Sequence, residues 1–172
     1  MKRNIRVELS VSGITELLEK LEDYQKWLEK KCDELAEKLA QRGFAVAQVI
    51  LANHVYSGQT LASLKVERVD EATYVVSAES EAILFIEFGS GLRGYGHPEP
   101  GDYGPGTYPG KGHWNDPNGW WYPTDDPVLA VRTNSKGEMW GHSYGMAPAM
   151  PMYTAVKTLE QELQSICNEV FK

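Results

Sequence analysis

The sequence predicts an α+β fold: a small antiparallel β-sheet packed by a long N-terminal helix and a C-terminal helix, with a long loop insertion rich in Gly, Pro and Trp. Three observations predict it. Apolar residues recur every three or four positions near both ends of the chain, which is the spacing of amphipathic helices. Residues 61–78 are rich in β-branched and aromatic side chains, which favour strands. Between residues 92 and 144, glycine and proline replace both patterns.

The N-terminal residues predict a strand followed by a short helix. Apolar side chains alternate at Ile5, Val7, Leu9 and Val11, which is the period of a half-buried strand. Ser12-Gly13 ends this pattern, and Ser12 with Thr15 and Glu16 supplies the polar groups that begin a helix. The helix would then carry the apolar residues Ile14, Leu17, Leu18 and Leu21.

A longer amphipathic helix is predicted from about Tyr24 to Asn53. Its apolar positions include Leu28, Leu35, Leu39, Val46 and Ile50. At ~1.5 Å per residue the helix would be about 45 Å long. Gly43 is the position at which we expect a bend, because glycine weakens helices.

The centre of the chain predicts a hairpin formed by Leu61–Val69 and Tyr74–Ala78, joined by the polar turn Asp70-Glu71-Ala72. Residues 82–88 are apolar almost throughout, and their periodicity fits a buried strand as well as a helical turn. Gly89-Ser90-Gly91 ends this segment, and we expect Gly89 and Gly91 to adopt positive φ at a chain reversal.

The C-terminal residues predict one helix with a narrow apolar stripe. Pro148 and Pro151 precede it, and proline is tolerated in the first turn of a helix. The stripe has alternating gaps of four and three residues and consists of Met152, Val156, Leu159, Leu163, Ile166 and Val170.

Length and charge limit the classes of function. A chain of 172 residues is long enough for a single domain, with a core formed by residues 1–91 and 145–172 and an excursion at 92–144. The net charge of -7 argues against a protein that grips the phosphates of DNA. Cys32 and Cys167 are expected to be reduced, part-buried thiols. Without a signal peptide or a run of ~20 apolar residues, we expect a soluble protein made in a cytoplasm.

The segment from Leu92 to Gly145 is the most unusual part of the sequence. It holds eleven of the 16 glycines, seven of the 9 prolines, four of the 5 tryptophans and five of the 9 tyrosines. At roughly 200 Å² per ring system, four exposed tryptophans would present about 800 Å² of apolar surface, more than the ~300 to 600 Å² of the largest patch on a typical monomer. We therefore expect an interface in this loop, with the candidate residues Trp114, Trp120, Trp121, Tyr122 and Trp140.

Catalytic, cofactor and metal sites are not indicated. The loop contains possible metal ligands, but their spacing matches no established metal motif, and we expect scattered surface residues: His97, His113 and His142, with Asp102, Asp116, Asp125 and Asp126. Ser90 lacks the Gly-x-Ser-x-Gly context of an esterase nucleophile. No glycine pattern that would cradle a phosphate opens a helix. We therefore expect no enzyme, no cofactor and no metal.

Three segments in serial order resemble a known family. They are His54–Leu64, Ile86-Glu87-Phe88-Gly89-Ser90-Gly91, and Gly145–Met152, which contains Pro148 and Pro151 and leads into the last helix. This order resembles the small head-tail joining proteins of tailed phages, also called neck or tail-completion proteins and often described as minor structural proteins. The likeness covers residues 13–91 and 145–171. The sequence departs from the family pattern where two residues, Gln59 and Thr60, separate Gly58 from Leu61, and where Met150-Pro151-Met152 replaces the usual Pro-Phe.

The resemblance implies a structural virion protein that assembles into a homo-oligomeric ring at the phage neck. Such a ring lies between the portal or adaptor and the tail-tube or tail-terminator proteins, and DNA is only its transient cargo. The family catalyses no reaction and needs no cofactor or membrane. Its members are made in the bacterial cytoplasm, from an active phage or a prophage, and commonly carry a variable Gly-, Trp- and Tyr-rich excursion where this chain has residues 92–144.

Alternatives remain open at this stage. Trp114, Trp120, Trp121 and Tyr122 would also suit a carbohydrate- or cell-wall-binding module, because half-exposed rings stack on sugars. The tryptophans would otherwise fold back over their own domain. Glu87 lies between Ile86 and Phe88, and its carboxylate would either reach solvent or pair with a basic group or with backbone amides.

Overall fold

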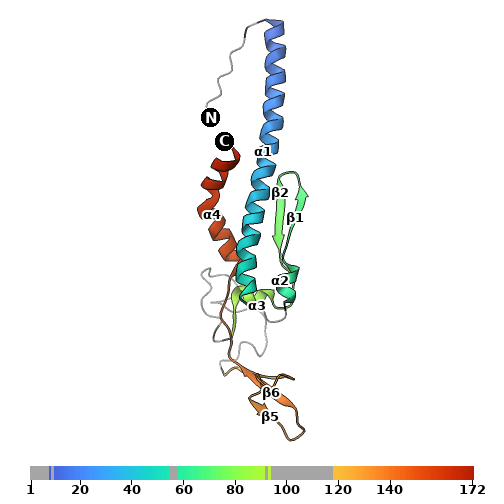
Figure 1. Ribbon diagram of the computed structural model, residues 1–172, viewed down its shortest axis with the longest axis vertical. Helices are drawn as coiled ribbons and strands as arrows, with labels where there is room; N and C mark the ends of the chain where they lie inside the picture. Colours follow the sequence, from blue (N-terminus) through green and yellow to red (C-terminus); the bar gives the residue numbers. More distant parts are fainter. Residues whose placement is uncertain (1–7, 9, 55–57, 92, 94–117) are drawn as a thin grey trace. The chain divides into compact units, whose positions relative to one another are not determined.

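The computed structural model describes residues 8, 10–54, 58–91, 93 and 118–172. Its class is α+β, as predicted, with a long N-terminal helix, small antiparallel sheets and a C-terminal helix (Figure 1). By its internal contacts the chain divides into two compact units, which are described one at a time. The first unit comprises Met1–Ala45, Lys65–Ser77 and Ala155–Lys172, and the second comprises Val46–Leu64 and Ala78–Thr154.

Helix α1 (Val11–Ala52) is one continuous helix of 42 residues, where the sequence predicted two. It begins earlier than expected because Ser10, not Ser12, caps it: the Gly13 amide donates to Ser10 Oγ at 3.1 Å and the Ile14 amide to the Ser10 carbonyl at 3.0 Å. Val11 is therefore helical, and Glu8 and Ser10 are in no strand, which contradicts this end of the predicted strand. The remainder of that strand lies outside the described residues.

In the first unit a carboxylate of α1 binds the hairpin of β1 (Lys65–Asp70) and β2 (Thr73–Ser77). Asp33 Oδ1 accepts from the Arg68 guanidinium at 2.9 Å and from the Ala72 amide at 3.2 Å. The strands are antiparallel with Val66 opposite Val76, which confirms the predicted hairpin. Its first strand is shorter than predicted, because residues 61–63 belong to a helical turn, α2 (Gln59–Ser63).

The C-terminal helix α4 (Pro151–Val170) also lies against α1 in the first unit, and small residues allow the close approach. Ala40, Gly43 and Ala155 are buried, and Leu159 Cδ1 lies 3.3 Å from where a Cβ on Gly43 would be. Figure 1 shows α4 and the hairpin both running alongside α1. The predicted stripe is wrong at Val156 and Leu163, which are both exposed.

In its described residues the second unit contains two small sheets and two short helices, α2 and α3, rather than a single sheet of the predicted kind. Residues 82–88, ambiguous in the sequence, form helix α3 (Ile83–Phe88). Strand β3 (Ser90–Gly91) pairs with β7 (Gly145–Met146). A separate three-stranded sheet has the order β4-β6-β5, formed by Trp120–Pro123, Met139–Ser143 and Arg132–Thr133. With the hairpin, the described residues contain three small sheets in place of one.

Two leucines that both fit the apolar periodicity of their helices differ in burial. Leu51 on α1 is fully buried in the second unit, whereas Leu163 on α4 is nearly half exposed. We expect Leu51→Ala to lower the free energy of unfolding by about 2 to 5 kcal/mol, because it leaves a cavity. Leu163→Ala is the matched control and should cost less than about 1 kcal/mol. Chemical denaturation of both variants is the measurement, and equal midpoints would contradict the burial of Leu51.

A second prediction concerns the ion pair between α1 and α4 in the first unit. Arg42 Nε and Nη2 donate to the two Glu162 carboxylate oxygens at 2.6 and 2.7 Å. This hydrogen bonding lowers the pKa of Glu162 below its ordinary value. Because the folded-state pKa is the lower one, the pair stabilises the fold above the unfolded-state pKa and loses this effect as pH falls through the folded-state pKa.

The measurement is an NMR titration of Glu162 in the parent chain and in Arg42→Gln. The Glu162 pKa should rise in the variant, and the difference in unfolding free energy between the two proteins should shrink as the pH is lowered. An unchanged Glu162 pKa would show that the pair does not persist in solution. Glu160, which lies on the same helix and pairs with Lys157, serves as the internal reference.

Candidate functional site

Two of the three segments that carry the family resemblance meet in the second unit and form one junction. The Ala149 amide donates to the Ile86 carbonyl at 2.8 Å, which joins the chain before α4 to helix α3. A few residues away, Ser90 pairs with Met146 and Gly91 with Gly145 across β3 and β7. We call the set of Ile86–Gly91 and Gly145–Tyr153 the motif junction. Residues about 55 to 65 positions apart are thus brought into direct contact.

Glu87 is the centre of the motif junction. Its side chain is only 8% exposed, and its two oxygens accept from the Met152 amide and the Tyr153 amide, each at 2.9 Å. Pro151 is the first residue of α4 and has no N–H, so these two amides are the first donors that the helix offers. The carboxylate also lies at the positive end of the helix dipole. The sequence left open whether the Glu87 carboxylate reaches solvent, a basic group or backbone amides. In the structure it pairs with backbone amides of its own chain.

Three glycines make the junction possible, Gly89 through its positive φ and Gly91 and Gly145 also because a Cβ would collide with the facing backbone. Gly89 and Gly91 have φ of 74° and 60°, which confirms the positive φ expected at this reversal. A Cβ on Gly91 would lie 2.5 Å from the Tyr144 carbonyl oxygen, and a Cβ on Gly145 would collide with the Ser90 carbonyl. Ser90 is itself buried between these strands. The Gly-Ser-Gly segment thus has a conformational role that its sequence context predicts.

The β4-β6-β5 sheet has two faces that differ in exposure. On one face Trp120, Tyr122 and Gly141 are buried or half-buried: Trp120 approaches Gly91, and the Tyr122 ring lies over Gly141. The opposite face is turned to solvent in the second unit. We call it the aromatic face, and its residues are Trp121, Arg132, Trp140, His142 and Tyr144.

The aromatic face is a row of rings in tilted and edge-to-face contact. His142 lies between Trp121 and Tyr144, with ring centroids 4.6 Å and 4.8 Å away. The guanidinium carbon of Arg132 lies 4.7 Å from the Trp121 ring centroid, within the range of a cation–π contact. Trp121 and Tyr144 nevertheless remain 44% and 46% exposed. Exposed rings held in fixed orientations are the side chains that protein interfaces and sugar-binding sites use.

The structure therefore separates the predicted interface residues. Trp121 is exposed on the aromatic face, Trp140 is half-buried there, and Trp120 and Tyr122 pack on their own unit. Trp114 lies outside the described residues. Sequence reasoning missed Arg132 and Tyr144, and it considered His142 only as a possible metal ligand. These residues can be assigned to the aromatic face only once Trp121 is known to lie opposite His142, and this requires the register of β4 against β6.

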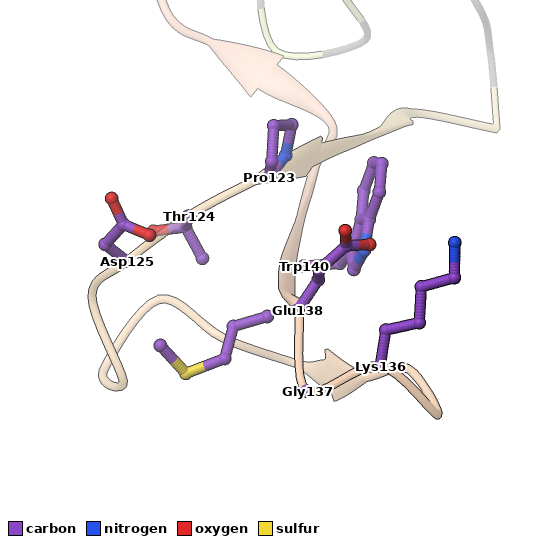
Figure 2. A pocket seen from close by; sticks show the side chains of 8 residues that line it. Pro123, Thr124, Asp125, Lys136, Gly137, Glu138 and Trp140 are labelled. Atoms are coloured by element: carbon purple, nitrogen blue, oxygen red, sulfur yellow. The ribbon is translucent and has the colours of Figure 1, made fainter.

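A shallow cleft of about 480 Å³ opens beside the aromatic face. Figure 2 shows Asp125 and Lys136 on opposite sides of it, with Trp140 between them. Its other lining residues are Pro123, Thr124, Gly137, Glu138 and Met139. The charges in the cleft are mixed, and its walls come from β4, β6 and the turns beside them.

The metal ligands considered in the sequence are not brought together in the part of the chain that the structure describes. There, no group of three or more His, Cys, Asp or Glu side chains is arranged to hold a metal ion. His142 lies in the aromatic face, whereas Asp125 and Asp126 lie in the turn after β4. His97, His113, Asp102 and Asp116 lie outside the described residues.

Comparisons with known proteins identified no relative of this chain. No family model matches the chain, and no curated protein or solved structure is significantly similar to it. Among the described residues, no helix is both long and apolar enough to cross a membrane.

The role of Glu87 is tested by removing its carboxylate. Glu87→Ala leaves the Met152 and Tyr153 amides without their acceptor and removes the negative charge from the start of α4. We expect the free energy of unfolding to fall by about 2 to 4 kcal/mol. Glu87→Gln keeps one acceptor oxygen and should lose about half as much.

Glu81→Ala is the control, because Glu81 is exposed just before α3. Its effect should stay within about 0.5 kcal/mol. Chemical denaturation gives the free energies, and amide hydrogen exchange at Met152 and Tyr153 gives the local effect. If Glu87→Ala and Glu81→Ala unfold at the same denaturant concentration, the carboxylate does not hold the junction.

Proposed function

We propose that this protein is a structural component of a phage virion, a ring-forming head-tail connector or tail-completion protein at the neck. The observation that carries the proposal is the motif junction. The resemblance rests on short segments in a fixed serial order, and two of them, Ile86–Gly91 and Gly145–Met152, are in mutual contact: the Ile86 carbonyl accepts from the Ala149 amide, and the Glu87 carboxylate accepts from the Met152 amide. This contact, together with the serial order, supports the resemblance.

The aromatic face supports an assembly role. In this proposal it binds a neighbouring virion protein, such as a portal, adaptor, tail-tube or tail-terminator protein, or a second copy of the chain. Aromatic side chains and arginine dominate the energy of such interfaces, and Trp121, Tyr144 and Arg132 lie together here. The net charge of -7 suits a conduit through which DNA passes without sticking. The protein would be made in the bacterial cytoplasm and act in the virion.

A second candidate is a carbohydrate- or cell-wall-binding module. The exposed planes of Trp121 and Tyr144 favour it, because aromatic rings beside polar groups suit sugars as well as proteins. A binding assay on peptidoglycan and on soluble glycans separates the two candidates. Retention of the parent chain on glycan, with no binding to neck proteins, would favour the module and contradict the connector.

The connector is tested with Trp121→Ala/Tyr144→Ala in a reconstitution with portal and tail-tube proteins of the same phage. We expect the parent chain to form rings in negative-stain images and to join these partners. The variant should bind them roughly thirtyfold or more weakly, as for loss of an interface hot spot of ~2 kcal/mol. Val128→Ala/Val131→Ala, which also removes exposed apolar side chains near this sheet, is the matched control and should bind normally.

Two results would contradict the proposal. One is a parent chain that forms no ring and joins no neck protein at any concentration. The other is an aromatic-face variant that joins the tail as well as the Val128→Ala/Val131→Ala control, which would remove the aromatic face from the interface. Thermal unfolding of both variants shows whether a loss of binding comes from a loss of folding.

A further inference from the structure

Arg132 is the only permanently charged member of the aromatic face, and its side chain crosses the width of the sheet. It starts on the edge strand β5, opposite Trp140 of the middle strand β6. Its guanidinium carbon reaches the Trp121 ring on β4, 4.7 Å from the ring centroid. The residue is exposed. A solvent-accessible positive charge therefore lies directly against the rings of this face.

The Arg132 guanidinium has hydrogen-bond donors that no described residue uses. A guanidinium carries several N–H donors in a planar fork that matches a carboxylate. Arg42 and Arg68 each pair with such a carboxylate in their own chain, on Glu162 and Asp33. Among the described residues, Arg132 has only its contact with an aromatic ring. Its donors are therefore available to an anion from outside the chain.

The carboxylates of the same sheet belong to its turns and not to the aromatic face. Asp126 Oδ1 accepts from the Val128 amide at 2.8 Å, and Glu138 Oε2 accepts from the Asn134 side chain at 2.6 Å. Asp125, the third acidic residue of this sheet and its turns, lines the cleft. The aromatic face itself contains no carboxylate.

A second arginine lies beside the other end of the face. Arg93 is exposed, and its amide donates to the Tyr144 carbonyl at 3.3 Å. Both arginines in the sequence of the second unit thus lie on or next to the aromatic face. The face combines positive charge with apolar rings, and its complement is a surface that combines negative charge with apolar side chains.

We propose that the aromatic face binds an acidic peptide segment of a partner protein, which places an Asp or Glu carboxylate on Arg132 and a neighbouring apolar side chain on Trp121 and Tyr144. Arginine binds a carboxylate through two parallel hydrogen bonds. The surrounding rings exclude water, which would otherwise weaken this ion pair.

A peptide suits this face better than other ligands because it supplies both groups. A neutral sugar covers the rings but brings no charge to Arg132. A nucleic acid brings many phosphates to a chain whose net charge is -7. The inference names the chemistry of the partner at the proposed interface, and it rests on the proposed function in taking that partner to be a protein.

Selection from a display library of random peptides tests the inference without knowledge of the natural partner. The library is selected on the immobilised whole chain, and peptides that also bind Trp121→Ala/Tyr144→Ala are removed. We expect the remaining peptides to carry Asp or Glu beside a large apolar residue. Each is then synthesised with a fluorescent label, once with its acid and once with the corresponding amide, Asn or Gln.

Fluorescence anisotropy gives the affinities. On the parent chain the acidic peptide should bind roughly thirtyfold more tightly than its amide counterpart. On Arg132→Gln the two peptides should bind alike, because the group that distinguishes them is gone. Lys26→Gln removes one positive charge from an exposed position on α1, so it is the matched control and should keep the difference. Circular dichroism monitors folding, and the comparison on the parent chain needs no variant.

Three outcomes would overturn the inference. Selection that yields no peptide specific for the aromatic face, or only peptides without Asp and Glu, rejects the acidic segment. A preference for the acid that persists in Arg132→Gln places the carboxylate elsewhere. An alginate oligomer or a single-stranded oligonucleotide that binds more tightly than any selected peptide, and loses this binding in Arg132→Gln, would replace the peptide by another anion.

These outcomes are distinct from failure of the connector. An acid-dependent peptide, found for a chain that forms no ring and joins no neck protein, would contradict the connector and keep the acidic partner. Joining to neck proteins that Arg132→Gln leaves unchanged would keep the connector and contradict the inference.

Discussion

The second unit depends on one buried carboxylate. Glu87 lies on the six-residue helix α3. Its two carboxylate oxygens nevertheless accept the hydrogen bonds that set the start of the 20-residue helix α4. Burying an ionised group is costly unless hydrogen bonds replace its water. Here two backbone amides do so, and they are donors that would otherwise be unpaired at a helix start. The carboxylate gains hydrogen bonds that replace its water, and the two amides gain an acceptor. This pairing explains why a charged residue lies between the apolar Ile86 and Phe88.

Much of the helical structure could be predicted from the sequence, because helices are local. The extent of α4 and of most of α1 follows from apolar spacing alone. The stripe of α4 was misplaced at Val156 and Leu163 because large apolar residues were counted and small ones were not. The buried positions include Ala155, and on α1 they are Ala40 and Gly43. Small residues mark close helix contacts, and a pattern of large side chains does not report them.

The sheets and the candidate site could be predicted less well, because strand pairing is not local. The sequence suggests strands at Trp120–Tyr122 no more than elsewhere in a glycine-rich segment, and it contains no information on which residue faces Trp121. Only the register of β4 against β6 places His142 and Arg132 with Trp121 on one face and Trp120 with Tyr122 on the other. The composition correctly indicated an unusual aromatic content, but it could not show which rings are packed and which are exposed.

The pairing of β3 with β7 has a consequence for how this chain can change in evolution. Gly91 and Gly145 are neighbours in space, so the residues between them leave the junction and return to it at a single point. The entropy of closing such a loop grows only with the logarithm of its length, and doubling the length costs about 0.6 kcal/mol. Natural selection could therefore lengthen, shorten or exchange this insertion between related chains, provided that both glycines and the Glu87 contact were retained.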